Sequence, residues 1–358
     1  MTERRRSHAA LSLLLPSLLA AGCAGAQPAT APVPPPAPPH VLLVTLDGLR
    51  WQEAFGGADS LVVWTRADST DLARRWWRPA REERRAALLP FLWGEVARRG
   101  QLLGDRAAGG GVRVTNGKYF SYPGYNELLT GRADERIASN DKVANPNVTV
   151  LEWLHRRPGF AGRVAAAASW DAFPWIINAA RSAIPVDTGQ DSANARMAAL
   201  LPRLWEATRF DLLTHRSALD RLWAAAPPRV LYVALGETDE WAHAGDYAQY
   251  LDAAHRDDAM IRELYEVFAG HPAVRGNLTL IVTVDHGRGD GPAWTDHGAR
   301  VPGAEWVWVG LMGPRVPPRG ARTGATGATL SQVAATVAAA AGEDYSTVPG
   351  AAGPLPLD

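Results

Sequence analysis

Carboxylate and imidazole side chains follow three short apolar segments of this chain. The segments cover residues 41–46, 230–235 and 278–284. The polar residues that follow them are Asp47, Asp239, His243, Asp285, His286 and His297. Zinc binds imidazole nitrogen and carboxylate oxygen, and two divalent ions about 3.5–4 Å apart can stabilise both oxygens of a displacement at phosphorus. Taken singly, each residue is better explained as a helix cap or a hydrogen-bonded polar group, whereas the six together indicate a metal site.

The three apolar segments have the pattern of strands buried on both faces. Such strands are typical of a parallel sheet with helices on both sides, so we expect an α/β, doubly wound fold. Ligands in this fold collect beyond the carboxyl ends of the strands, where these polar residues follow. Asp239 and His243 are one helical turn apart and can converge, and the adjacent Asp285 and His286 can point to two different ions. The expected cofactors are two divalent metal ions, with zinc favoured and manganese an alternative.

A serine before a proline and a glycine is the second candidate for chemistry. The segment reads Ser121-Tyr122-Pro123-Gly124-Tyr125, and a short helix is predicted to start there. Ser121 Oγ at a helix N-terminus would lie where the helix dipole favours an anion. The alternative is that Ser121 only caps the helix, as most serines before helices do.

These motifs together, in this order, resemble the alkaline phosphatase superfamily. The closest resemblance is to its type I phosphodiesterase/nucleotide pyrophosphatase-like branch, over about residues 41–311. The motifs are Leu46-Asp47-Gly48, the Ser121 segment with Leu128-Leu129-Thr130-Gly131, Asp239-x-x-x-His243, Val284-Asp285-His286-Gly287 and His297-Gly298. The set is specific, although no single motif is.

The resemblance implies a role for each residue. Ser121 would be the nucleophile, and Asn140 would contact a phosphoryl oxygen. One metal ion would be held by Asp47, Ser121, Asp285 and His286, and the other by Asp239, His243 and His297. Tyr125 stands where sulfatases of this superfamily carry an arginine, which disfavours sulfatase chemistry. It also departs from the histidine often found there in the phosphodiesterase branch.

The function expected from these motifs is hydrolysis of phosphate monoesters or diesters through a phosphoserine. The alternatives are a phosphoglycerate mutase-like phosphotransferase, a phosphonate hydrolase, or a catalytically inactive, metal-stabilised envelope binding protein. The substrate would be a small-molecule phosphate ester. A nucleic-acid polymer is not expected, because 37 Lys and Arg residues balance 37 Asp and Glu residues.

The N-terminus indicates export. Residues 1–23 combine arginines, an apolar stretch and small residues before Cys23, as in a signal peptide. Residues directly before this cysteine resemble a bacterial lipoprotein signal, so we predict a lipid anchor at Cys23, with simple signal cleavage as the alternative. A Pro/Ala-rich tether is predicted over residues 24–39. The protein would then be periplasmic or in the cell envelope, with the anchor as its only membrane contact.

The remaining chain is predicted to form one catalytic domain over residues 40–345. A helical insertion is expected at about residues 173–226, and residues 346–358 are expected to form a loosely held tail. Cys23 is the only cysteine, which excludes an internal disulfide and a cysteine-based zinc site.

Overall fold

The computed structural model describes residues 37–189, 200, 204–324 and 327–357. The predicted signal peptide, Cys23 and most of the predicted tether lie outside these residues. The last residues of the predicted tether, 37–39, contact the folded unit. Asn277 Nδ2 donates a hydrogen bond to the carbonyl oxygen of Ala37 at 2.7 Å.

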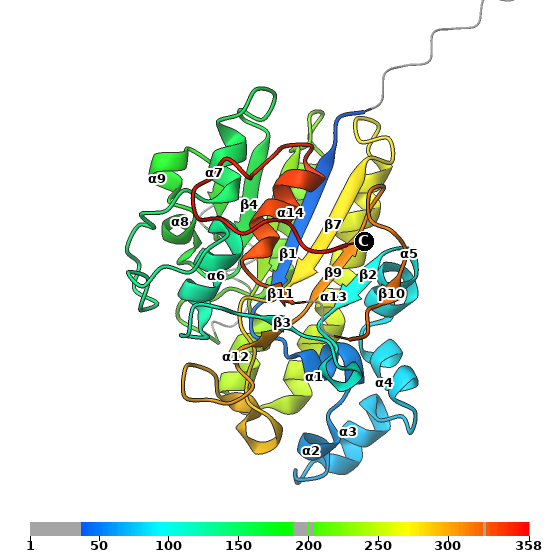
Figure 1. Cartoon of the computed structure of the whole chain (residues 1–358). Helices are drawn as coiled ribbons and strands as arrows, with labels where there is room; N and C mark the ends of the chain where they lie inside the picture. Colours follow the sequence, from blue (N-terminus) through cyan, green and yellow to red (C-terminus); the bar gives the residue numbers. More distant parts are fainter. Residues whose placement is uncertain (1–36, 190–199, 201–203, 325–326, 358) are drawn as a thin grey trace, which may run out of the picture. The chain divides into compact units, whose positions relative to one another are not determined.

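A mixed, mainly parallel sheet forms the centre of the described residues, with strand order β10-β2-β9-β7-β1-β6-β4-β5 (Figure 1). The strands are β1 (His40–Leu46), β2 (Gln101–Leu103), β4 (Val164–Ala168), β5 (Val186–Asp187), β6 (Val230–Leu235), β7 (Leu278–Thr283), β9 (Val309–Met312) and β10 (Gly320–Ala321). Strands β7, β1, β6, β4 and β5 run parallel, whereas β9 is antiparallel to β7. The expected α/β fold is confirmed.

Strands β7, β1 and β6 lie side by side, and all their residues are buried. Their apolar, partly β-branched sequences suit a strand that is covered on both faces. In the register, Leu46 lies opposite Leu235, and Thr45 lies opposite Thr283. The three strands therefore end at the same edge of the sheet, and their following residues start from neighbouring points.

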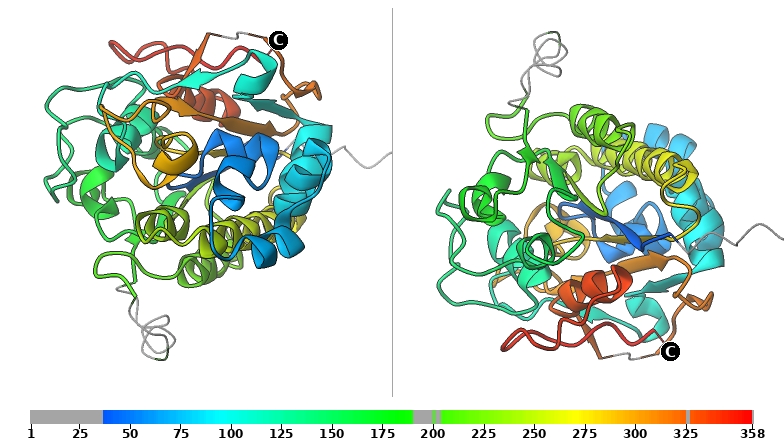
Figure 2. Two further views of the ribbon diagram at one scale, coloured as in Figure 1. Left: turned by 90° about the horizontal axis from the view of Figure 1, so that it is seen from below. Right: turned by 90° about the horizontal axis from the view of Figure 1, so that it is seen from above.

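Helices cover both faces of this sheet (Figure 2). The long helix α13 (Tyr247–Gly270) and the C-terminal helix α14 (Gln332–Ala340) pack against β1 from opposite sides. The other helices and helical turns are α1 (Trp51–Gly56), α2 (Ser60–Val63), α3 (Ser69–Trp76), α4 (Arg81–Leu88), η1 (Leu92–Val96), α5 (Ala97–Arg99), η2 (Arg106–Ala108), α6 (Ser121–Thr130), α7 (Val150–His155), α8 (Phe173–Ile176), α9 (Ala179–Ser182), α11 (Asp211–Leu222), α12 (Glu237–His243) and η3 (Gly291–Thr295).

The region predicted as a helical insertion, residues 173–226, differs from that prediction where the structure describes it. Strand β5 pairs with β4 and extends the main sheet, and helix α11 packs against β4 and β6. The described part of this region therefore completes the layers of the domain. Residues 190–199 and 201–203 lie outside the described residues.

The prediction of a loosely held tail is wrong for residues 346–357. Leu355 is buried, and its backbone N–H donates to Thr336 Oγ1 of α14 at 2.9 Å. Gln101 Nε2 donates to the carbonyl oxygen of Leu357 at 2.7 Å. The apolar surface of α14 explains this placement, because the tail covers part of it.

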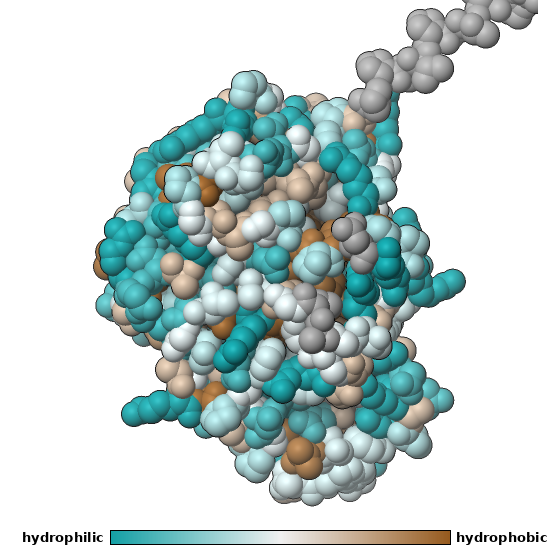
Figure 3. Space-filling model, in the orientation of Figure 1, coloured by the Kyte–Doolittle hydropathy of each residue, from teal (hydrophilic) through white to brown (hydrophobic). Residues whose placement is uncertain are grey.

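A second, three-stranded sheet lies beside the main one. It pairs β11 (Ala328–Thr329), β3 (Val112–Arg113) and β8 (Trp306–Val307). The apolar segment over residues 305–311 is divided between the two sheets, since Val307 ends β8 and Val309 begins β9. On the face drawn in Figure 3, hydrophobic residues are scattered among hydrophilic ones. Within the described ranges, no helix has both the length and the apolar composition needed to cross a membrane.

Candidate functional site

The carboxyl ends of β1, β6 and β7 bring the predicted metal ligands to one place. Asp47 follows β1 directly, and Asp285 and His286 follow β7 after one residue. Helix α12 begins two residues after β6 and carries Asp239 and His243. The loop after β7 continues through η3 and returns to the same edge. It carries the sixth ligand candidate, His297.

Four of the predicted residues form a buried group, which we call the strand-end group: Asp47, Ser121, Asp285 and His286. His286 Nε2 lies 3.3 Å from Asp47 Oδ1 and 3.5 Å from Asp285 Oδ2. Ser121 Oγ lies 3.5 Å from the same nitrogen. The four side chains therefore meet around one imidazole edge.

The other three residues form a more accessible group, which we call the helix-loop group: Asp239, His243 and His297. His243 Nε2 lies 3.2 Å from Asp239 Oδ2 and 3.0 Å from His297 Nε2. His286 joins the two groups, because its Nε2 is 3.8 Å from Asp239 Oδ1 and its ring stacks on His297. Potential ligand atoms lie within 4.8 Å of one another in two sets, Asp47/Asp285/His286 and Asp239/His286/His297.

The buried carboxylates of the strand-end group fit a cation. Asp47 Oδ1 and Asp285 Oδ2 are buried and accept no hydrogen bond from the described residues. Burial raises the pKa of both carboxyl groups well above the usual value, and the charges of neighbouring carboxylates raise it further. A buried carboxylate oxygen without a partner is costly, and a bound divalent ion would remove that cost.

Two of the three imidazoles, those of His286 and His297, are in the neutral form that binds metal ions. Burial lowers the pKa of His286 to about 4 and that of His297 to about 2, so both are neutral at neutral pH. His286 Nδ1 lies 2.9 Å from the carbonyl oxygen of Gly287, and His297 Nδ1 lies 3.2 Å from that of Tyr119. These acceptors place the proton on Nδ1, which leaves Nε2 of each ring unprotonated, as a metal ligand must be.

Ser121 is the first residue of helix α6. Phe120 occupies the cap position, so the alternative in which Ser121 is only a helix cap does not describe this structure. Gly124 lets the helix approach the strand-end group, because a Cβ at this position would lie 2.3 Å from the carbonyl oxygen of Asp285. Asn140 lies at the same helix end, where its Oδ1 accepts from the backbone N–H of Tyr122 at 2.9 Å.

Three supporting residues were not assigned a role from the sequence. Tyr125 donates from its hydroxyl to Asp47 Oδ2 at 2.9 Å, and Arg288 contacts the carboxylate of Asp239. Asp211 accepts from the backbone N–H groups of Gly236 and Glu237 at 2.7 and 2.8 Å, and so holds the start of α12. Tyr125 is one helical turn after Ser121 and Arg288 is two residues after His286, which are signals the sequence does contain. Asp211 offers none.

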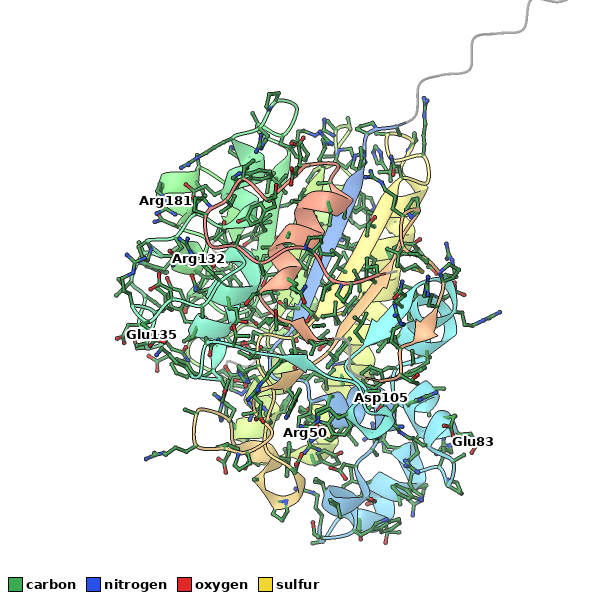
Figure 4. The ribbon with its side chains drawn as sticks, in the orientation of Figure 1. Arg50, Glu83, Asp105, Arg132, Glu135 and Arg181 are labelled. Atoms are coloured by element: carbon green, nitrogen blue, oxygen red, sulfur yellow. The ribbon has the colours of Figure 1, made fainter. Side chains whose placement is uncertain are left out.

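A buried arginine supports the segment after Asp47. Arg50 lies at the carboxyl end of the sheet beside α1 (Figure 4). Its Nε donates to Glu53 Oε2 at 2.9 Å, and its NH1 donates to the carbonyl oxygen of Gly289 at 2.9 Å. Gly289 belongs to the loop between His286 and His297, so Arg50 ties two ligand-bearing segments together.

No protein-family model and no curated protein sequence matches this chain. Solved structures do match. One is described as a sulfatase from Bacteroides thetaiotaomicron, with a TM-score of 0.57 and 12% identity over 88% of this chain and 73% of that one. Another is the zinc complex of the C-terminal periplasmic domain of EptC from Escherichia coli, with a TM-score of 0.54 and 13% identity over 88% of each chain.

A third match is the lipoteichoic acid synthase LtaP from Listeria monocytogenes, with a TM-score of 0.53 and 9% identity over 87% of this chain and 73% of that one. These three proteins share the architecture of the alkaline phosphatase superfamily. This chain has the alkaline phosphatase-like fold. At these identities the likeness concerns the fold, so the chemistry must be argued from the residues at the edge of the sheet.

Proposed function

We propose that this protein is an exported, metal-dependent phosphoric ester hydrolase that acts through a phosphoserine. The observation that carries the proposal is the position of Ser121 Oγ, at the start of α6 and 3.5 Å from His286 Nε2 in the strand-end group. A hydroxyl at a helix N-terminus beside buried carboxylates and a neutral imidazole suits a nucleophile that a cation activates.

Two divalent ions, with zinc favoured, would be held by the residues assigned to them. Asp47, Ser121, Asp285 and His286 would hold one, and Asp239, His243 and His297 the other. When bound, such ions lower the pKa of a hydroxyl and stabilise negative charge on the attacking and leaving oxygens. The residues of the chain fix the positions of both groups, and the N-terminus of α6 favours the negatively charged phosphoryl group.

The reaction has two displacements at phosphorus. In the first, the Ser121 hydroxyl loses its proton to water, its Oγ bonds to phosphorus, and the bond to the ester oxygen breaks. The leaving alkoxide takes up a proton and departs as the alcohol. In the second, a water oxygen bonds to phosphorus and the bond to Ser121 Oγ breaks, which restores the serine hydroxyl and releases phosphate or a monoester. Asn140, at the N-terminus of α6, would donate from its amide to a phosphoryl oxygen.

Phosphoryl chemistry is favoured over sulfuryl chemistry by Tyr125. This side chain is buried, and its hydroxyl is engaged by Asp47. It occupies the place of the arginine in the sulfatase motif Cys/Ser-x-Pro-x-Arg, in which the first residue is converted to an aldehyde. The substrate we propose is therefore a small-molecule phosphate ester, in keeping with the phosphodiesterase-like motifs.

The test combines metal analysis with turnover. The purified domain should contain two equivalents of zinc and should hydrolyse p-nitrophenyl phosphate or bis-p-nitrophenyl phosphate, and the ratio of the two rates would rank monoesters against diesters. Bound metal without turnover of any phosphate ester would favour a binding protein instead. Conversion of 3-phosphoglycerate to its isomer would favour a mutase. Absence of metal binding, even with added zinc or manganese, would contradict the proposal.

Export and lipidation are part of the same proposal. Cys23 would carry the lipid, and the Pro/Ala-rich segment after it would hold the domain away from the membrane. In the natural host, Cys23→Ser should move the protein from the membrane fraction to the soluble fraction. An unchanged distribution would contradict the lipid anchor and leave the proposal about the metal site intact.

A further inference from the structure

Arg288 joins the segments that carry the helix-loop group. Its side chain is buried at 1% exposure, on the loop that follows His286. One terminal nitrogen donates to Asp239 Oδ1 and lies 3.2 Å from the backbone carbonyl oxygen of the same residue. The other terminal nitrogen donates to the carbonyl oxygen of Thr295, two residues before His297. The guanidinium group therefore links α12 to the loop that returns with His297.

The charge of Arg288 is permanent and directed at one ligand candidate. A guanidinium group keeps its proton at any pH that a folded protein tolerates. Arg288 and His243 both contact the carboxylate of Asp239, and the guanidinium group supplies a full positive charge to it. Asp239 is therefore an already neutralised carboxylate.

The backbone of Gly48 leaves room for this arrangement. Gly48 has a φ of 60°, and a Cβ on it would lie 2.8 Å from Arg288 Nε and 2.9 Å from Asp239 Oδ1. Any larger residue would push the guanidinium group and the carboxylate apart. A glycine directly after Asp47 thus leaves room for the Arg288 guanidinium group beside the carboxylate of Asp239.

The strand-end group has no such charge on its carboxylates. Asp47 Oδ1 and Asp285 Oδ2 receive no hydrogen bond from the part of the chain that the structure describes. The other oxygen of each receives a neutral donor, from Tyr125 to Asp47 and from the backbone of Gly48 to Asp285. Two carboxyl groups without a cationic partner leave more room for the charge of a divalent ion than one carboxylate that is already paired with an arginine.

We propose that Arg288 is a positioning residue that makes the helix-loop group the weaker of two cation sites. This inference rests on the proposed function, because it concerns the ions of the same site. An ion bound to Asp239 must share that carboxylate with the guanidinium group or displace it. The strand-end group therefore fills first, and the helix-loop group fills only at higher metal concentration.

The experiment is a calorimetric titration of the metal-free full-length protein with zinc. Wild type should show two steps, and Arg288→Gln should tighten the weaker step by about tenfold or more while the stronger step stays the same. Arg288→Lys keeps the charge and should keep the two steps as far apart as in wild type. Arg262→Gln is the matched control, because it removes one arginine from an exposed ion pair with Glu266 far from the site.

A second variant identifies the weaker site without altering Arg288. His243→Ala should remove the weaker step and leave the stronger one. Loss of the stronger step in His243→Ala, or an unchanged or weakened second step in folded Arg288→Gln, would overturn the inference. With turnover and two zinc steps in wild type, that result would leave the proposed function standing. A wild-type protein that binds no zinc would overturn both.

Discussion

The strand-end group and the helix-loop group differ in how deeply their side chains are buried. The side chains of Asp285 and His286 are 0% exposed and that of Asp47 is 7% exposed, whereas those of Asp239 and His243 are 16% and 49% exposed. The first group follows strands that hydrogen-bond to each other, so the sheet fixes its geometry. The second depends on a short helix and a glycine-containing loop.

The two groups also differ in what compensates their charge. The strand-end carboxylates are buried beside neutral donors, and Asp239 is paired with Arg288. In the metal-free protein, the carboxyl groups of Asp47 and Asp285 therefore lack a cationic partner, whereas the carboxylate of Asp239 has one. The chain itself therefore supplies a positive charge to the helix-loop group but none to the carboxyl groups of the strand-end group.

The largest effect should come from removing the nucleophile. Ser121→Ala should lower kcat on p-nitrophenyl phosphate by about 10³-fold or more, because it removes the hydroxyl that forms the ester bond to phosphorus. Zinc binding should fall much less, since Asp47, Asp285 and His286 remain. The control is Ser139→Ala, on the exposed loop before Asn140. Near-normal turnover in Ser121→Ala would exclude a phosphoserine.

The next effect concerns the stability of the metal-free protein, where the two groups should respond in opposite directions. Asp239→Asn should lower the free energy of unfolding by about 3 kcal/mol, because it leaves the buried Arg288 without its carboxylate. Asp285→Asn should leave stability unchanged or raise it by about 1 kcal/mol, because a neutral amide replaces a buried carboxyl group that has no cationic partner. Urea unfolding at pH 7 in the presence of a chelator measures both. Equal destabilisation by the two variants would contradict the inference that only Asp239 has a cationic partner in the chain.

A smaller, pH-dependent effect on the free energy of unfolding should come from Asp211, which supports the start of α12. Burial, and then the charge of Glu237, raises the pKa of Asp211 to about 7. A raised pKa means that the folded state favours the protonated form, so this contribution to stability is lost as pH rises through about 7. From pH 5 to pH 8 the loss is roughly 2 kcal/mol.

Asp211→Asn, which is neutral at every pH, should lack this dependence. Its destabilisation relative to wild type, measured by urea unfolding of the metal-free protein, should therefore be smaller at pH 8 than at pH 5. The control is Asp220→Asn, which removes an exposed ion pair with Arg216 on α11, the helix that also carries Asp211. A constant difference between Asp211→Asn and wild type across this range would show that Asp211 does not titrate there.

The smallest effect should come from Tyr125→Phe, which removes one neutral hydrogen bond to Asp47. The tighter zinc step should weaken by about tenfold, as is usual for the loss of a group that orients a metal ligand. The weaker step should not change, since Tyr125 does not contact the helix-loop group. Competition with a zinc chelator measures this. A change confined to the weaker step would reverse the assignment of Tyr125 to the strand-end group.

The sequence by itself determined the sheet and the set of residues at its edge. The runs before Asp47, Asp239 and Asp285 are apolar enough to require burial on both faces, and parallel strands place their carboxyl ends together. The start of α6 at Ser121 was also readable, because the hydroxyl, Pro123 and Gly124 mark a helix start. These features depend on local pattern and on general rules of sheet topology.

Only the tertiary structure decided how each group is supported. The bonds of Tyr125 to Asp47, of Asp211 to Gly236 and of Arg288 to Asp239 each join residues at least 25 positions apart, and no periodicity records such contacts. The packed tail was missed for the same reason, since its composition is that of a loop and its burial comes from α14. The pKa of each carboxyl group also depends on its burial and on the charges around it, and neither can be read from residue type alone.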